Sequence, residues 1–160
     1  MGQFSEFSLP VRLFLKAYPW RRIHPVPWAP LRKPLRECRV ALASSAGLSL
    51  PDQPPFDDTM KGGDPSFRFI PRDADVRQFA ENHRSESFDH SGLQRDPNLG
   101  FPLDRLRELQ AAGRIGEVAP RHLAFMGSIT APGRLIRDTA PPAVDALVAD
   151  AVDVALLVPV

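Results

Sequence analysis

The sequence predicts an α/β protein with a mostly parallel sheet and flanking helices, preceded by a proline-rich N-terminal arm. From residue 39 onward, short apolar runs of strand-like composition alternate with stretches of helical periodicity, an order typical of a parallel sheet covered by helices. Eleven of the 18 prolines stand at or before Pro71, where each would interrupt a helix. We therefore expect a basic arm over residues 1–38 and an α/β domain over residues 39–160.

The individual elements follow from periodicity and from the residues that end them. Residues 152–160 (VDVALLVPV) hold an uninterrupted apolar run from Val154 to Val158, as in a strand buried on both faces. Leu103, Leu106 and Leu109 share one face of a helix that Gly113 is placed to end. In all, we expect strands over residues 39–45, 66–70, 121–129 and 152–160, and helices over residues 9–18, 102–112 and 141–151.

Composition excludes several classes of protein. With 43% hydrophobic and 24% charged residues, the chain resembles an ordinary globular protein rather than a disordered one. No apolar run approaches the roughly 20 residues that span a bilayer, and no secretory signal is visible. The single cysteine, Cys38, excludes an internal disulfide and a metal site made only of cysteines. We expect a cytoplasmic protein with an inert Cys38 thiol, because no histidine or second cysteine accompanies it.

Charge is unevenly distributed. Residues 1–40 hold eight Lys or Arg against two acids, whereas residues 41–160 hold twelve against seventeen. A basic arm can bind nucleic acid or an anionic membrane. The arginines of the arm are interleaved with prolines, however, and do not share a helical face. We therefore expect the arm to cover its own acidic domain or a partner subunit, with no nucleic acid and no membrane as partner.

The densest polar cluster follows residue 82 and is the candidate site. His83 and His90 stand seven residues apart, with Asp89 beside the second. Such a trio can provide a histidine base oriented by a carboxylate, or two histidines and a carboxylate for a metal. Alternatively, a loop of this composition hydrogen-bonds its own backbone. The candidate residues for substrate binding or proton transfer are His83, Asp89, His90, Asp96 and Asn98.

Some kinds of site are excluded because their motifs are missing from the sequence. The glycine-rich spacings that cradle phosphates are absent, as is the G-x-S-x-G motif of serine hydrolases. His122 falls inside a predicted strand, so we expect a hydrogen-bonded core histidine there.

Several blocks, taken in order, resemble the selenoprotein B family of glycine, sarcosine and betaine reductases, which includes the selenocysteine subunit of D-proline reductase. The central block DPNLGFPLDRLRELQAAGRIGEVAPRHLAFMGSI (residues 96–129) is similar to the middle block of that family. The PVPWAPLRKPL arm matches its short, single-chain bacterial members. The other similar blocks are RVALASSAGLSLPDQPPF (residues 39–56), SFDHSGL (residues 87–93) and the terminal VDVALLVPV.

The resemblance implies a selenol- or thiol-dependent oxidoreductase that reductively cleaves an amino acid or a related substrate. In the family, selenocysteine or cysteine follows the last strand at once, with a further cysteine three residues on. The catalytic residue is thus expected immediately after Val160 and none within the chain. We interpret the chain as truncated at a selenocysteine codon, and therefore C-terminally incomplete and inactive alone. Apart from selenocysteine, no cofactor and no metal are expected.

The resemblance also implies partners, namely a small-molecule substrate, a thiol reductant and either a partner subunit or a second copy. In the amino-acid reductases, a pyruvoyl-bearing partner subunit activates the substrate. Two other interpretations remain at this stage. One is a non-catalytic, partner-binding α/β protein, and the less favoured one is a metal-dependent hydrolase built on His83, Asp89 and His90.

Overall fold

The structure is a computed structural model that describes residues 7–19, 22–85 and 90–160. The chain divides into two compact units, Met1–Pro30 and Leu31–Val160. Within the first unit, α1 (Leu9–Ala17) has Pro10 in its first turn and ends before Pro19, as the sequence predicts. None of its residues is buried.

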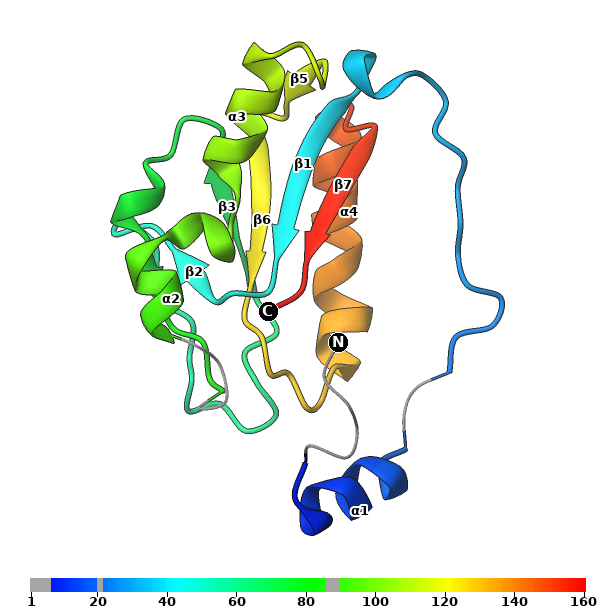
Figure 1. Cartoon of the computed structure of the whole chain (residues 1–160), viewed down its shortest axis with the longest axis vertical. Helices are drawn as coiled ribbons and strands as arrows, with labels where there is room; N and C mark the ends of the chain where they lie inside the picture. The colour runs from blue at the N-terminus through cyan, green and yellow to red at the C-terminus, as the bar shows by residue number, and fades with distance from the viewer. Residues whose placement is uncertain (1–6, 20–21, 86–89) are drawn as a thin grey trace. The chain divides into compact units, whose positions relative to one another are not determined.

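The second unit is built around β1 (Arg39–Ser44), which forms hydrogen bonds along both edges (Figure 1). On one edge it pairs in parallel with β7 (Val154–Val158). On the other it pairs in parallel with β5 (Glu117–Val118) and then with β6 (Arg121–Phe125). β3 (Phe67–Pro71) lies antiparallel to β6. The prediction of an α/β fold with a mostly parallel sheet is confirmed.

One buried histidine explains why β5 and β6 are separate strands. Pro120 between them has no backbone N–H to donate. Next along β1, the N–H of Leu42 donates to His122 Nδ1 at 3.0 Å instead of to a strand carbonyl. His122 is fully buried, which confirms it as a core residue. Its Nε2 has no hydrogen-bond partner in the described ranges, so the ring is only half satisfied.

Helices cover the two faces of the sheet (Figure 1). α3 (Leu103–Ala111) buries Leu103 and Leu106 in the main core, as its apolar spacing predicts, whereas Leu109 on the same predicted face is exposed. On the other face, α4 (Ala140–Ala149) buries Ala143 and follows a π-helical turn, Leu135–Thr139, that the sequence analysis did not predict. Within the described ranges, no helix is long and apolar enough to cross a membrane.

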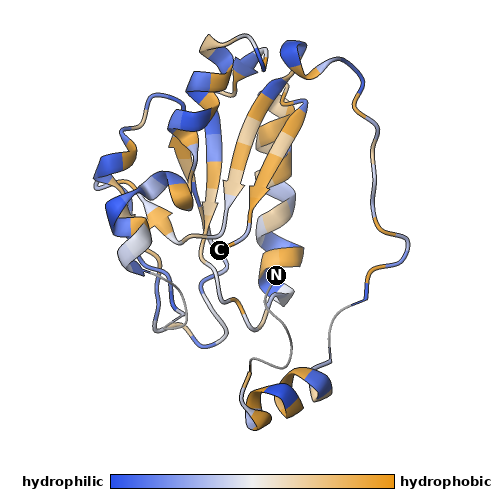
Figure 2. Ribbon diagram, viewed as in Figure 1, coloured by the Kyte–Doolittle hydropathy of each residue, from blue (hydrophilic) through white to orange (hydrophobic). Residues whose placement is uncertain are grey.

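The prediction that the C-terminal strand is buried on both faces is wrong. Leu156 is 43% exposed and Leu157 is 70% exposed. β7 pairs only with β1 among the described strands, so it lies at the edge of the sheet and its apolar side chains are incompletely covered. Figure 2 shows that apolar residues run along β7 and recur along the neighbouring α4.

A smaller layer leads to the candidate site. β2 (Leu48–Ser49) pairs antiparallel with β4 (Ala80–Glu81), which brings residue 83 back beside the end of β1. Gly47 makes this return possible: its φ is +67°, and a Cβ there would stand 2.9 Å from the backbone nitrogen of His83. The remaining elements are the helix α2 (His90–Arg95) and the short 3₁₀ turns Leu35–Glu37, Val76–Gln78 and Pro97–Leu99.

Candidate functional site

A pocket of about 410 Å³ lies where β1, β6 and β7 end. Parallel α/β sheets bind their ligands at this carboxyl edge. The chain segments that form it include the ends of all three strands and the approach to α4. Its wall is mainly apolar, and its polar residues are Ser44 and Ser45 at the end of β1 and Ser128 after β6. We call it the edge pocket; among its lining residues are Ser44, Ser45, Phe125, Ile129, Leu135 and Leu157.

His83 reaches this edge because Gly127 has no side chain. Gly127 follows β6 and lines the edge pocket. A Cβ at Gly127 would stand 2.1 Å from His83 Nε2 and 2.7 Å from the carbonyl oxygen of Ser45. The imidazole therefore lies directly against the backbone at the end of β6.

The environment of His83 favours its neutral form at pH 7. Burial lowers the pKa of His83, and a hydrogen bond with the backbone of Val160 and the charge of Glu81 only partly oppose this effect. The N–H of Ser85 donates to His83 Nδ1 at 3.2 Å. In the neutral ring the proton is then on Nε2, the nitrogen beside Gly127.

Glu81 links the two histidines of the predicted trio. One carboxylate oxygen accepts a short hydrogen bond from the His83 backbone N–H, and the other lies 2.8 Å from His90 Nδ1. His90 Nε2 lies 3.1 Å from the carbonyl oxygen of Ser85. The centroids of the two imidazole rings are 6.4 Å apart. Asp89, which the sequence suggested as the orienting carboxylate, lies outside the described residues.

The sequence analysis missed Glu81, although a signal for it exists. In an extended segment, residues two apart point to the same side, so Glu81 and His83 are neighbours if residues 80–83 form a strand. The ambiguous periodicity of residues 76–83 concealed that arrangement.

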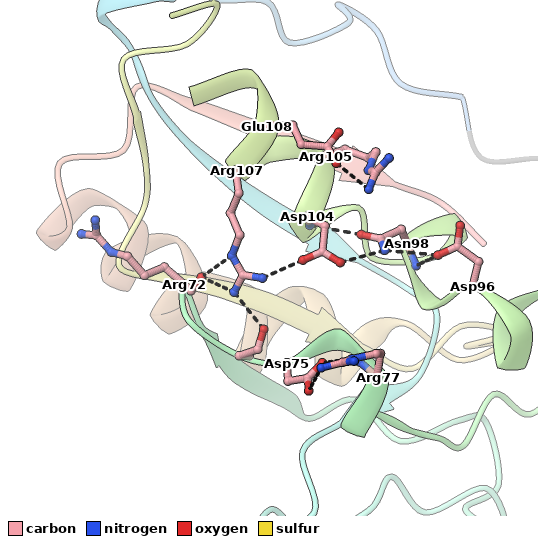
Figure 3. A network of polar contacts seen from close by, with 10 residues as sticks. Arg72, Asp75, Arg77, Asp96, Asn98, Asp104, Arg105, Arg107 and Glu108 are labelled. Atoms are coloured by element: carbon pink, nitrogen blue, oxygen red, sulfur yellow. Dashed lines mark hydrogen bonds and ion pairs between the residues drawn. The ribbon is translucent and has the colours of Figure 1, made fainter. Parts of the chain in front are cut away.

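Asp96 and Asn98 make local contacts in a different polar network (Figure 3). Asp96 Oδ1 accepts the backbone N–H of Asn98 at 3.0 Å and caps a 3₁₀ turn. The Asn98 amide donates to Asp104 Oδ2 at 3.1 Å, which joins this turn to the first turn of α3. These bonds explain both side chains as structural, and their role in substrate binding stays a prediction.

A second depression, of about 650 Å³, adjoins that network. It is lined by three arginines, each with an acidic partner: Arg72 with Glu117, Arg77 with Asp75, and Arg107 with Asp104. Arg107 also donates to the carbonyl oxygens of Arg72 and Ala74. Because its charges neutralise one another within the protein, we assign the candidate site to the edge pocket.

Cys38 lies away from the edge pocket. It immediately precedes β1, whereas the pocket lies at the opposite end of that strand. A strand rises about 3.3 Å per residue, so the two are roughly 20 Å apart. The thiol is buried and faces the carbonyl oxygens of Lys33 and Pro34 at 3.5 and 3.4 Å. Across the described part of the chain, no three His, Cys, Asp or Glu side chains are grouped as metal ligands.

Comparison with known proteins identifies the family. The model of the glycine/sarcosine/betaine reductase selenoprotein B family matches residues 9–159. The chain belongs to this family. The predicted resemblance is thereby confirmed. The strand ends that form the edge pocket of this selenoprotein B family member all lie within the matched residues.

A curated relative of this selenoprotein B chain is the D-proline reductase subunit gamma of Acetoanaerobium sticklandii. The two are 33% identical over 133 residues, which are 83% of this chain and 53% of the relative. The chain thus spans about half the length of that relative. No solved structure matches the chain.

Proposed function

We propose that this chain is the part of an amino-acid reductase subunit that holds the substrate's carbon skeleton against a selenol or thiol nucleophile. The observation that carries this proposal is the apolar edge pocket, which lies at the carboxyl ends of three parallel strands and has His83 beside it. The relative named as a D-proline reductase subunit supports an amino acid as the substrate class.

The proposed reaction cleaves a carbon–nitrogen bond next to a carboxylate. A selenolate or thiolate forms a bond to the α-carbon while the carbon–nitrogen bond breaks, and the amine leaves with a proton. A second thiol then attacks the selenium or sulfur, and the α-carbon departs and takes up a proton. The resulting selenenyl sulfide or disulfide is reduced by an external dithiol. A low-pKa nucleophile is ionised at neutral pH, which makes the first step fast.

We place the nucleophile at the position that follows Val160, with its resolving cysteine three residues further on. Two observations support that position. Ser45 Oγ accepts the backbone N–H of Val160 at 3.0 Å, so the residue after β7 is held beside the end of β1. The buried Cys38 precedes β1 and is remote from this edge. On this proposal, the 160 residues alone have no catalytic turnover.

His83 has the features of a proton carrier in this scheme. Its neutral ring can take up the proton that the second thiol gives up, and the imidazolium so formed can give a proton from Nε2, next to the pocket wall, to the departing α-carbon. Glu81 fixes the backbone of His83 and contacts His90. We propose His83 as the proton-transfer residue, and Glu81 and His90 as positioning residues.

Partner subunits are part of the proposal. The relative is named as one subunit of its enzyme. The exposed apolar side chains of β7 and α4, such as Leu157 and Val148, each 70% exposed, provide a surface on which another polypeptide segment can pack.

The experiment is dithiol-dependent cleavage of the α-carbon–nitrogen bond by the complete protein, translated beyond Val160 and supplied with its natural partner subunits. The reduced carboxylate product is measured, because opening the proline ring releases no separate amine. D-Proline, glycine, sarcosine and betaine are the substrates to compare. We expect turnover with at least one of them, a roughly 100-fold or greater loss of kcat in His83→Gln, and full activity in Cys38→Ser. Equal turnover by the 160-residue chain, or loss of turnover in a Cys38→Ser protein of unchanged stability, would overturn the proposal.

A further inference from the structure

Two arginines from distant parts of the chain meet at one methionine, Met60. Arg84 Nη1 donates to the carbonyl oxygen of Met60 at 3.0 Å. Arg134 Nη2 lies 3.2 Å from Met60 Sδ. Arg84 follows His83, and Arg134 precedes Leu135, which lines the edge pocket. Both guanidinium groups therefore converge on Met60.

The loop that carries Met60 is fixed to the wall of the edge pocket. Gly62 and Gly63 adopt φ values of +91° and +93°, which let the loop turn tightly onto residues 129–131. The N–H of Ala131 donates to the Gly62 carbonyl oxygen at 3.1 Å. A Cβ on Gly63 would stand only 3.0 Å from Ile129, a residue of the pocket wall. The point where the arginines meet thus has a fixed position relative to the pocket.

The two arginines also have guanidinium N–H donors that are available to bind a carboxylate. Across residues 7–19, 22–85 and 90–160, neither forms an ion pair with a carboxylate, whereas nearby Arg137 binds Asp138 with Nε and Oδ1 2.7 Å apart. A guanidinium has five N–H donors in a planar fork that fits a carboxylate. One donor of each group is used at Met60, which orients the fork and leaves the other donors available.

We infer that Arg84 and Arg134 form a carboxylate-binding pair at the rim of the edge pocket, and that the ligand is a small monocarboxylate whose apolar carbon skeleton enters the pocket. The pocket supplies the apolar wall, and the pair supplies the charge that such a ligand requires. The catalytic consequence of this inference rests on the proposed function. A carboxylate held at the rim places the adjacent α-carbon at the pocket mouth, near His83.

Binding of a matched pair of probes to the full chain tests the inference. Cyclopentanecarboxylate has the charge and the apolar ring, whereas cyclopentanecarboxamide has the same ring without the charge. In an NMR titration, we expect the carboxylate to shift the backbone signals of Ser128 and Ile129 and to bind at least tenfold more tightly than the amide. Arg84→Ala and Arg134→Ala should each weaken carboxylate binding about tenfold and leave amide binding unchanged. Arg137→Ala, the matched control, should bind both probes like the unaltered protein.

Three results would overturn the inference: equal affinity for the two probes, an equal loss in Arg137→Ala, or shifts confined to the arginine-lined depression around Arg107. The test is independent of turnover, so the pair can be established even if the reductase assay fails. Conversely, where the complete enzyme turns over, each variant should raise KM more than it lowers kcat. The factor by which KM rises should be at least ten times the factor by which kcat falls. An unchanged KM would refute the pair and leave the proposed function standing.

Discussion

Replacing Gly127 by alanine is expected to destabilise the chain by about 1–3 kcal/mol and to displace His83 from the edge pocket. The new methyl group would stand 2.1 Å from His83 Nε2 and 2.7 Å from the Ser45 carbonyl oxygen. Real non-bonded carbon contacts are near 3.5–4.0 Å, so both groups must move. Chemical denaturation of the variant measures the change in the free energy of unfolding.

Two controls make this expectation specific. Gly133→Ala meets nothing within 4 Å, so its unfolding free energy should change by no more than about 0.5 kcal/mol. The double variant Gly127→Ala/His83→Ala removes the closest contact and keeps the one with Ser45. It should therefore be less destabilised than the sum of the single variants by about 1 kcal/mol or more. Strict additivity would show that His83 does not lie against Gly127.

Acidification should remove about 3 kcal/mol of stability through His122 alone. Burial, together with the charges of Arg107 and Arg72, lowers the pKa of His122 from 6.5 to about 4. The unfolded chain therefore binds a proton at a higher pH than the folded chain does. The stability contribution is complete above pH 6.5 and is lost progressively as the pH falls to about 4. The measurement is the free energy of unfolding across this range.

His122→Asn separates this effect from the titration of the carboxylates. An asparagine oxygen can still accept the N–H of Leu42, but the side chain does not titrate. The unaltered protein should lose about 3 kcal/mol more than the variant between pH 7 and 4. NMR titration of the imidazole in the unaltered protein provides a second readout if the variant folds poorly. A His122 pKa near 6.5, or parallel stability curves, would contradict the buried, half-satisfied ring.

Much of the fold could be predicted because local signals agreed with tertiary structure. The helix over Leu103–Ala111 follows from its leucine spacing, and β1 follows from an apolar run ended by a glycine turn. The burial of β7 could not be predicted, because an apolar strand has the same sequence signal at an edge as in the middle of a sheet. Its exposure depends on which strands pair with it.

The candidate site could likewise be predicted only in part. His83 and His90 could be predicted as site residues from their residue type and from the density of polar residues around them. Their carboxylate partner could not, because Glu81 reaches both only through the pairing of β4 with β2. The convergence of Arg84 and Arg134 depends on contacts between segments 50 residues apart in sequence. Pattern analysis of one sequence has no access to such contacts.

Mass spectrometry of a trapped intermediate tests the central claim most directly. The complete protein, with its proposed resolving cysteine replaced by serine and with its partner subunits, is reduced, freed of dithiol and incubated with substrate for a single turnover. The account predicts a covalent adduct in which the substrate's α-carbon is bonded to the selenium or sulfur of the residue that follows Val160. Gly127→Ala should reduce the adduct yield, and Cys38→Ser should not. An adduct on Cys38, or turnover with no adduct beyond Val160, would contradict the account.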